Sequence, residues 1–179
     1  MRLLLAALFV AALGLSQASA ADPANTVVME LKTGKVVIEL LPALAPKHVG
    51  RIKLLVKDKF YDGVVFHRVI QGFMAQTGDP TGSGSGGSTY PDLPAELTGT
   101  PFKRGTLGAA RTNNPDSANS QFFICFTDDG CAHLQGQYTV FGQVIEGMEH
   151  IDKVKAGSGQ SVAIASPDKI VAMRMAGAQ

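Results

Sequence analysis

One short stretch of the sequence places strong hydrogen-bonding groups among apolar side chains. The stretch is FHRVIQGFMAQTGD at 66–79, in which Arg68 and Gln76 stand among phenylalanine, valine, isoleucine and methionine residues. A guanidinium costs several kcal/mol to desolvate unless something pairs with it. Arg68 is therefore expected either to pair with a carboxylate or to donate its hydrogen bonds to a ligand.

A second stretch, SQFFIC at 120–125, alternates in the manner of a β-strand. Gln121, Phe123 and Cys125 fall on one face of such a strand, and two further apolar residues fall on the other. The break at Gly72 resets the register of the first stretch, so the polar groups of both stretches can meet above an apolar floor. The residues that can meet in this way are Arg68, Gln76 and Gln121 around Phe73, Met74 and Phe123.

Other kinds of reactive site have little support. The four histidines are scattered, and the sequence has no HExxH, GxSxG or Walker motif. The segment GSGSGGS at 82–88 lacks the Lys-Ser/Thr of a phosphate-binding loop and is typical of a flexible loop. His67, Asp79 and Ser120 form a Ser-His-Asp set without any positional signature. We expect neither a metal site nor a cofactor.

The first twenty residues have the composition of a signal peptide. Arg2 precedes an apolar run, and the segment ends in the small-x-small pattern Ala18-Ser19-Ala20. The run is shorter than the roughly 20 residues that span a bilayer. The pattern predicts a cleaved leader at 1–20, a mature domain at 21–179, and an exported protein that is periplasmic or secreted. An uncleaved membrane anchor is the alternative.

Charge and cysteine content narrow the class of protein further. Without Arg2, the chain has equal numbers of basic and acidic residues, and it shows no basic stripe of the kind that binds nucleic acid. We see no unused apolar stripe, which favours a monomer. Cys125 and Cys131 can form a disulfide in an oxidising compartment, although the apolar run around Cys125 favours a core thiol. The sequence leaves this pairing open.

The elements that must position these groups are mostly strands. Residues 26–42 have the alternation of a β-hairpin with a turn at Thr33-Gly34, and 43–61 have the period of an amphipathic helix that begins near Pro46. No strand–helix–strand rhythm recurs, which favours an antiparallel sheet or barrel with helices at its ends. The remaining predicted elements are strands within 64–76, 105–111, 121–126, 138–147 and 169–175, a helix at 148–156, and a long loop at 79–101.

Four segments taken together resemble the cyclophilins, the cyclosporin-type peptidyl-prolyl cis-trans isomerases. They are, in the order expected of the family, FHRVIQGFMAQTGDPTGSGSGG at 66–87, GTLGAART at 105–112, SQFFIC at 120–125 and TVFGQVIEGME at 139–149. The resemblance extends over essentially the whole of 21–179. It implies a mainly β fold, a closed eight-stranded antiparallel barrel capped by two α-helices, and an isomerase that acts without a cofactor.

The resemblance also assigns roles to single residues. It implies that Arg68 is catalytic and donates hydrogen bonds toward the prolyl nitrogen of the substrate, while Gln76 holds either the substrate backbone or Arg68. Thr112 falls on a segment whose backbone binds the peptide, and Tyr138 stands where many relatives have histidine. The residues implied to bind substrate are Phe73, Met74, Gln76, Thr112, Gln121, Phe123, Leu134 and Tyr138.

The sequence departs from the family pattern in two places. It contains no tryptophan, and His133 stands where many cyclophilins carry one that contributes to cyclosporin binding. We therefore expect weak cyclosporin binding with isomerase activity retained. Thr77 stands where the family usually has glycine.

The expected partners are proline-containing peptides and unfolded exported proteins. A non-catalytic peptide-binding chaperone on the same fold is the main alternative, and an exported barrel with another ligand is a third.

Overall fold

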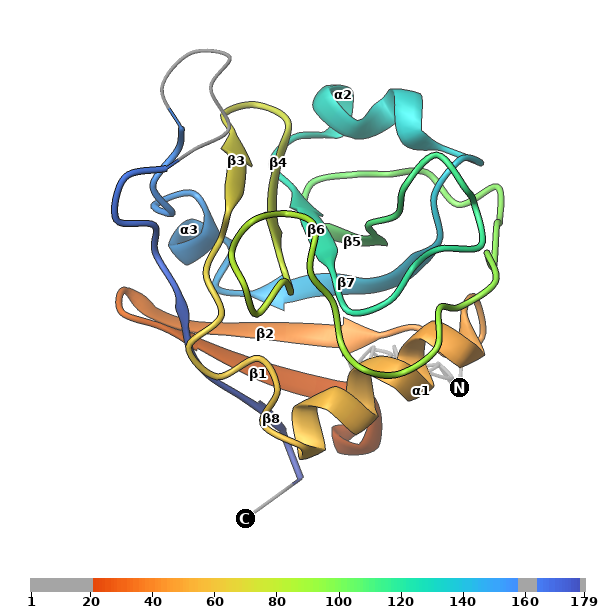
Figure 1. Ribbon diagram of the computed structural model, residues 1–179, viewed down its shortest axis with the longest axis horizontal. Helices are drawn as coiled ribbons and strands as arrows, with labels where there is room; N and C mark the ends of the chain where they lie inside the picture. The colour runs from red at the N-terminus through yellow and green to blue at the C-terminus, as the bar shows by residue number, and fades with distance from the viewer. Residues whose placement is uncertain (1–20, 158–163, 178–179) are drawn as a thin grey trace, which may run out of the picture.

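The computed structural model describes residues 21–157 and 164–177, so the expected leader at 1–20 lies outside the described residues. Eight antiparallel strands form one curled sheet in the order β3-β4-β6-β5-β7-β2-β1-β8 (Figure 1). The strands are β1 Thr26–Leu31, β2 Gly34–Leu40, β3 Arg68–Ile70, β4 Met74–Thr77, β5 Thr106–Ala109, β6 Phe122–Cys125, β7 Val140–Glu146 and β8 Ile170–Met175.

The two edges of the sheet meet just before strands β3 and β8 begin. Val65 forms an antiparallel bridge with Lys169. On one side of that bridge, the Gly63 amide donates to the Ile170 carbonyl at 2.8 Å and the Ile170 amide donates to the Val64 carbonyl at 2.9 Å. On the other side, the Phe66 amide donates to the Asp168 carbonyl at 2.8 Å. The predicted eight-stranded antiparallel barrel is confirmed, and its edges are joined by this short pairing rather than by a full ladder.

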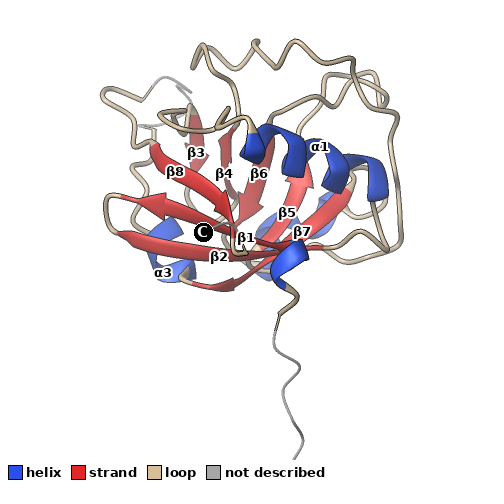
Figure 2. Cartoon of the chain, turned by 90° about the horizontal axis from the view of Figure 1, so that it is seen from below, coloured by secondary structure: helices blue, strands red, loops and turns tan. Residues whose placement is uncertain are grey.

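Both predicted helices are present. Helix α1, Pro46–Lys57, begins with proline at its first turn, where the missing amide hydrogen costs nothing. Its apolar face, which includes Val49, Ile52 and Leu55, is buried where the helix contacts β7 and β8. Helix α3, Met148–Ile151, contacts β2 and ends earlier than the predicted 148–156. Figure 2 shows α1 and α3 on different sides of the barrel.

A third helix was not predicted. Helix α2, Asp128–Cys131, is a single turn that leads into a 3-10 turn at Ala132–Leu134; a further 3-10 turn, Pro23–Asn25, precedes β1. The Thr127 hydroxyl caps α2 by accepting from the Gly130 amide at 3.0 Å. None of the helices in the described ranges is long and apolar enough to cross a membrane.

The first hairpin and the long loop agree with prediction except at one turn. Strands β1 and β2 pair with Leu31 opposite Gly34, so the two-residue turn is Lys32-Thr33, one residue earlier than predicted. The chain from 78 to 105 contains no helix and no named strand, and Leu93 forms an isolated antiparallel bridge with Ala118 of the segment between β5 and β6.

The apolar residues divide into two clusters, one on each face of the sheet. In β6, Phe122 and Ile124 face the main core inside the barrel, whereas Phe123 and Cys125 belong to a second cluster on the outer face. The alternation predicted for β6 is therefore confirmed. The second cluster also contains Met74, Phe102, Cys131, Leu134 and Val140, with Phe73 and Tyr138 packed against it.

Candidate active site

Strands β4 and β6 carry the apolar floor of the candidate site. Gln76 pairs with Phe123 across the two strands, and Gly108 of β5 lies on the other side of Phe123. A Cβ atom at position 108 would stand 2.3 Å from the Phe123 ring. Glycine therefore leaves the room that this ring needs. Phe102, which comes from the long loop, stacks on the other side with its ring centroid 5.7 Å away.

A cavity of about 160 Å³ opens on this floor, and we call it the proline pocket after the role that the family resemblance implies for its lining. Met74, Phe123 and Leu134 are buried, and Phe73 and Tyr138 are partly exposed at its wall. Two lining residues, Ala110 and Arg111, were missed by the sequence analysis. The predicted site residues that line this cavity are Arg68, Phe73, Met74, Gln76, Phe123, Leu134 and Tyr138.

Arg68 is the first residue of β3 and lies at the edge of the proline pocket. Its Nη1 approaches the Met74 sulfur at 3.7 Å, and its guanidinium carbon lies 5.9 Å from the centroid of the Phe73 ring. Every other arginine in the described ranges donates to a carboxylate or a carbonyl oxygen. Arg68 has no oxygen acceptor among the described residues, so its N–H groups face the pocket without a carboxylate partner.

Gln76 lies opposite Arg68 in the β3–β4 pairing and links the proline pocket to a second cavity. The Gln76 Nε2 donates to Gln121 Oε1 at 2.8 Å. Gln121 lines the second cavity, which has a volume of about 440 Å³, and its Nε2 donates to the carbonyls of Gly84 and Gly86. The polar groups predicted around the floor are therefore adjacent, but Gln121 lies beside the proline pocket rather than in it.

Thr112 also lies in the second cavity. Its amide donates to the Ser117 hydroxyl at 2.9 Å, and its carbonyl accepts from Arg111 Nη1 at 2.8 Å. Both backbone groups are thus engaged within their own loop. The role of this segment in binding the peptide backbone stays a prediction.

Arg111 and Tyr138 form one wall of the proline pocket. The Arg111 guanidinium carbon lies 4.4 Å from the Tyr138 ring centroid, and Arg111 Nη2 donates to the Gln137 carbonyl at 2.9 Å. The Tyr138 ring in turn meets Phe123 edge to face at 5.6 Å. A basic residue at the end of the strand predicted over 105–111 was the only sequence signal for Arg111, and that signal does not identify the ring on which it stacks.

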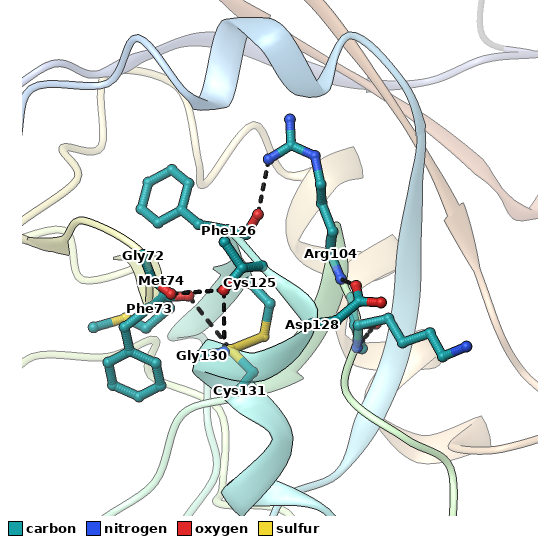
Figure 3. Close-up of a disulfide and its surroundings, with 12 residues drawn as sticks. Gly72, Phe73, Met74, Arg104, Cys125, Phe126, Asp128, Gly130 and Cys131 are labelled. Carbon is teal, nitrogen blue, oxygen red and sulfur yellow. Dashed lines mark hydrogen bonds between the residues drawn. A yellow bond between two sulfur atoms is a disulfide. The ribbon is translucent and has the colours of Figure 1, made fainter.

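The opposite wall is held by the disulfide that the sequence left open. Cys125 and Cys131 are bonded, with their Cα atoms 6.1 Å apart (Figure 3). His133 follows this link but does not line the proline pocket; its ring lies 5.3 Å from the Phe73 ring.

Thr77 is fully buried, and its hydroxyl donates to the Val65 carbonyl at 2.9 Å, which ties β4 to the segment before β3.

The chance Ser-His-Asp set does not form a triad. The Ser120 hydroxyl donates to the Gly78 carbonyl, and the Asp79 carboxylate accepts from its own loop. Burial lowers the pKa of His67, and neither of its ring nitrogens has a hydrogen-bond partner among the described residues. These groups have no nucleophile–base geometry.

Comparison with known proteins agrees with the geometry. Residues 26–175 match the family described as cyclophilin type peptidyl-prolyl cis-trans isomerase/CLD. A probable peptidyl-prolyl cis-trans isomerase of Brucella suis is 57% identical over 182 residues, covering 94% of this chain and 92% of that protein. A peptidyl-prolyl cis-trans isomerase of Helicobacter pylori is 41% identical over 140 residues, covering 75% of this chain and 83% of that protein.

Solved structures show the same fold. A cyclophilin from Hirschia baltica superposes with a TM-score of 0.76 at 27% identity, covering 87% of this chain and 75% of that one. A cyclophilin-type isomerase of Cryptosporidium parvum, crystallised in the presence of the dipeptide Ala-Pro, superposes with a TM-score of 0.76 at 28% identity. That match covers 84% of this chain and 98% of the other.

Proposed function

The chain belongs to the cyclophilin-type peptidyl-prolyl cis-trans isomerases, and we propose that it accelerates X–Pro rotation in exported proteins through Arg68. Its enzymatic activity is peptidyl-prolyl cis-trans isomerisation. Cyclophilins bind proline-containing peptides, and the proposed substrates are such peptides within unfolded exported chains. Uncatalysed X–Pro isomerisation takes tens to hundreds of seconds, slow enough to limit folding.

The chemistry requires neither a nucleophile nor a metal. Resonance gives the C–N bond partial double-bond character and a rotation barrier of about 18–20 kcal/mol. When the bond twists, the nitrogen lone pair is no longer delocalised, so the nitrogen becomes a better hydrogen-bond acceptor. A donor fixed beside that nitrogen binds the twisted state more tightly than either planar isomer, and this difference lowers the barrier.

The observation that carries the proposal is the position of Arg68. Its guanidinium stands at the edge of the proline pocket without an oxygen acceptor among the described residues. With a proline ring on Phe123 and Met74, the prolyl nitrogen would lie at the edge of the apolar floor. A proline ring bound there would displace water from the floor, which strengthens a hydrogen bond from Arg68.

The test is the exchange rate of a short X–Pro peptide measured by NMR with wild type and Arg68→Ala. We expect kcat/KM to fall on the order of a hundredfold in the variant, which corresponds to roughly 2.7 kcal/mol of transition-state stabilisation. Arg51→Ala is the matched control, because the Arg51 guanidinium also lies over an aromatic ring, 5.2 Å from the Tyr90 centroid, and does not line the proline pocket. Equal rates for all three proteins would remove Arg68 from the mechanism.

Export is the second part of the proposal. The pattern of residues 1–20 supports a cleaved leader, and a disulfide between Cys125 and Cys131 fits an oxidising compartment. Cell fractionation followed by mass determination of the mature chain tests this part. We expect a periplasmic or secreted monomer that begins near Ala21, whereas a full-length chain retained in the cytoplasm or the membrane would contradict it.

A further inference from the structure

The Asp79 carboxylate, two residues after the end of strand β4, is fully buried and serves as the acceptor for a whole loop. It accepts from the Gly84 amide at 2.6 Å, the Gly86 amide at 3.1 Å and the Thr81 amide at 2.8 Å. The hydroxyls of Thr81 and Ser83 add two further hydrogen bonds. A buried charge is tolerated only when it is satisfied in this way. The loop is therefore folded around the carboxylate.

The pKa of Asp79 fits this arrangement. Burial alone would raise it, but the hydrogen bonds from Gly86, Thr81 and Gly84 outweigh burial and hold the pKa well below the ordinary range of an aspartate. The group is consequently a carboxylate at neutral pH, and as a carboxylate it only accepts hydrogen bonds. All of its lone pairs are available to loop donors.

The same loop turns two carbonyl groups toward the candidate site. The carbonyl oxygens of Gly84 and Gly86 accept from Gln121 Nε2 at 3.0 and 2.8 Å. Two carbonyl acceptors can face only the NH₂ end of an amide, so the Gln121 Oε1 must point the other way. It points toward Gln76, whose Nε2 donates to it at 2.8 Å.

This sequence of contacts fixes the orientation of Gln76. A glutamine amide is otherwise free to turn by half a rotation, which exchanges its donor and acceptor ends. Because Gln76 Nε2 faces Gln121, the Gln76 Oε1 is left free to accept from a ligand or from a neighbour in the proline pocket that Gln76 lines together with Arg68. An acceptor at that position suits a guanidinium or a peptide N–H.

We propose that Asp79 is a positioning residue for the isomerase. Its carboxylate holds the loop so that two loop carbonyls orient the amide of Gln121. Gln121 then orients the amide of Gln76 with its acceptor toward the groove. This inference rests on the proposed function of the groove around Arg68.

A carboxylate is required at position 79 because every loop group that meets it is a donor. In Asp79→Asn, one oxygen acceptor is replaced by an NH₂ group, which opposes either the N–H groups of Gly84 and Gly86 or the N–H group of Thr81, depending on how the amide is turned. The approach is also close, since a Cβ atom at Gly86 would stand 2.1 Å from Asp79 Oδ1. The carbonyls on the same loop residues should move when this contact is lost.

The experiment compares Asp79→Asn with a matched control, Glu96→Gln. Glu96 has the same chemistry elsewhere: it accepts the Lys47 amide at 3.1 Å, the His48 amide at 3.0 Å and His48 Nδ1 at 2.7 Å. Burial raises its pKa, and these hydrogen bonds lower it further than burial raises it. It holds the start of α1 and has no hydrogen bond to either glutamine.

Two readouts are recorded with the full mature chain, at a temperature at which each protein is folded. The first is the side-chain NH₂ signals of Gln76 and Gln121 in ¹H–¹⁵N spectra, and the second is the isomerisation rate of an X–Pro peptide. We expect Asp79→Asn to shift both pairs of amide signals and to lower kcat/KM roughly tenfold. Glu96→Gln should leave the amide signals and the rate as in wild type.

The proposal is overturned if the glutamine signals and the rate respond to Asp79→Asn no more than to Glu96→Gln, since Asp79 would then only stabilise its loop. If Asp79→Asn does not fold, Gly86→Ala takes its place, because it displaces the same contact and keeps the charge. The variant Gln76→Ala tests the role of Gln76 separately from the role of Asp79. Full activity in that variant would contradict the proposed role of Gln76, while the amide signals would still decide the role of Asp79.

Discussion

The disulfide between Cys125 and Cys131 joins the end of strand β6 to helix α2 directly behind the Phe73 wall of the proline pocket (Figure 3). The Cys131 sulfur lies 3.4 Å from the Phe73 carbonyl oxygen, and the Thr127 hydroxyl donates to the Gly72 carbonyl at 2.8 Å. The covalent link thus fixes the segment that also supplies Leu134 to the pocket.

Reducing this disulfide should weaken both folding and substrate binding. Opening so short a loop should lower the free energy of unfolding by about 2 kcal/mol. KM for an X–Pro peptide should rise more than kcat falls, because Leu134 is held less firmly while Arg68 is untouched. Denaturant unfolding and kinetics with and without reductant measure these effects.

The double variant Cys125→Ala, Cys131→Ala is the control for the reductant. It should behave like the reduced wild type and should not respond to reductant. If wild type with both thiols titrated retains its unfolding midpoint and its KM, the link has no part in holding the pocket.

Sequence periodicity predicted the elements whose form is decided locally. The alternation of SQFFIC placed Phe123 and Cys125 together on one face of β6, and the spacing after Pro46 located helix α1. The hairpin register followed in the same way, apart from a turn that lies one residue earlier. In each case the pattern of burial is already present in the order of apolar residues.

Features that depend on distant contacts could not be predicted in this way. Helix α2 has only one turn and depends on a cap from Thr127, on a disulfide, and on close approach of Gly130 to the Gly72 carbonyl. Barrel closure at Val65 and Lys169 joins two segments far apart in the chain, and the alternation within each segment does not specify the other as its partner.

The same distinction between local pattern and distant contacts applies to the residues of the candidate site. Residues on β4 and β6 could be assigned from alternation and family resemblance. Asp79 and Arg111 could not, because their importance lies in which loop and which ring they meet. A glycine-rich loop such as 82–88 has no periodicity, so its fold around a carboxylate is visible only in three dimensions.

Cyclosporin binding should be weak in the wild type and stronger in His133→Trp. His133 lies beside Phe73 and outside the lining of the proline pocket, so it offers a bulky hydrophobic ligand little surface. Calorimetry should give a wild-type Kd weaker than about 1 μM, equivalent to roughly −8 kcal/mol. Tryptophan adds a large apolar ring with an N–H donor and should tighten binding by roughly tenfold.

His133→Ala is the control for that substitution. It should leave cyclosporin binding weak and the isomerase rate close to wild type, since position 133 lies outside the pocket. A submicromolar complex with the wild-type protein would contradict the expectation that this position limits cyclosporin affinity.

The stability of the protein should fall as the pH drops below about 6.5, in part because of His67. Only 8% of His67 is exposed, and burial lowers its pKa from the usual 6.5; the nearby Asp79 opposes this shift, and Arg68 adds to it. Below pH 6.5 the unfolded chain takes up a proton that the folded chain resists, so acid favours unfolding. Above that pH both states hold the imidazole neutral, and this contribution does not change.

Urea unfolding of wild type and His67→Gln at pH 7.5, 6.5 and 5.5 measures the effect. Each buried histidine can change the free energy of unfolding by up to about 1.4 kcal/mol per pH unit. His48 also has a lowered pKa, chiefly from burial, so a residual slope should persist in the variant. Asp79 and Glu96 have lowered pKa values, so these carboxylates stabilise the folded chain at neutral pH. That contribution is lost only when the pH falls below the ordinary pKa range of carboxylates, which lies outside the three pH values measured. Identical slopes for both proteins would mean that His67 takes up protons equally in the folded and unfolded chains.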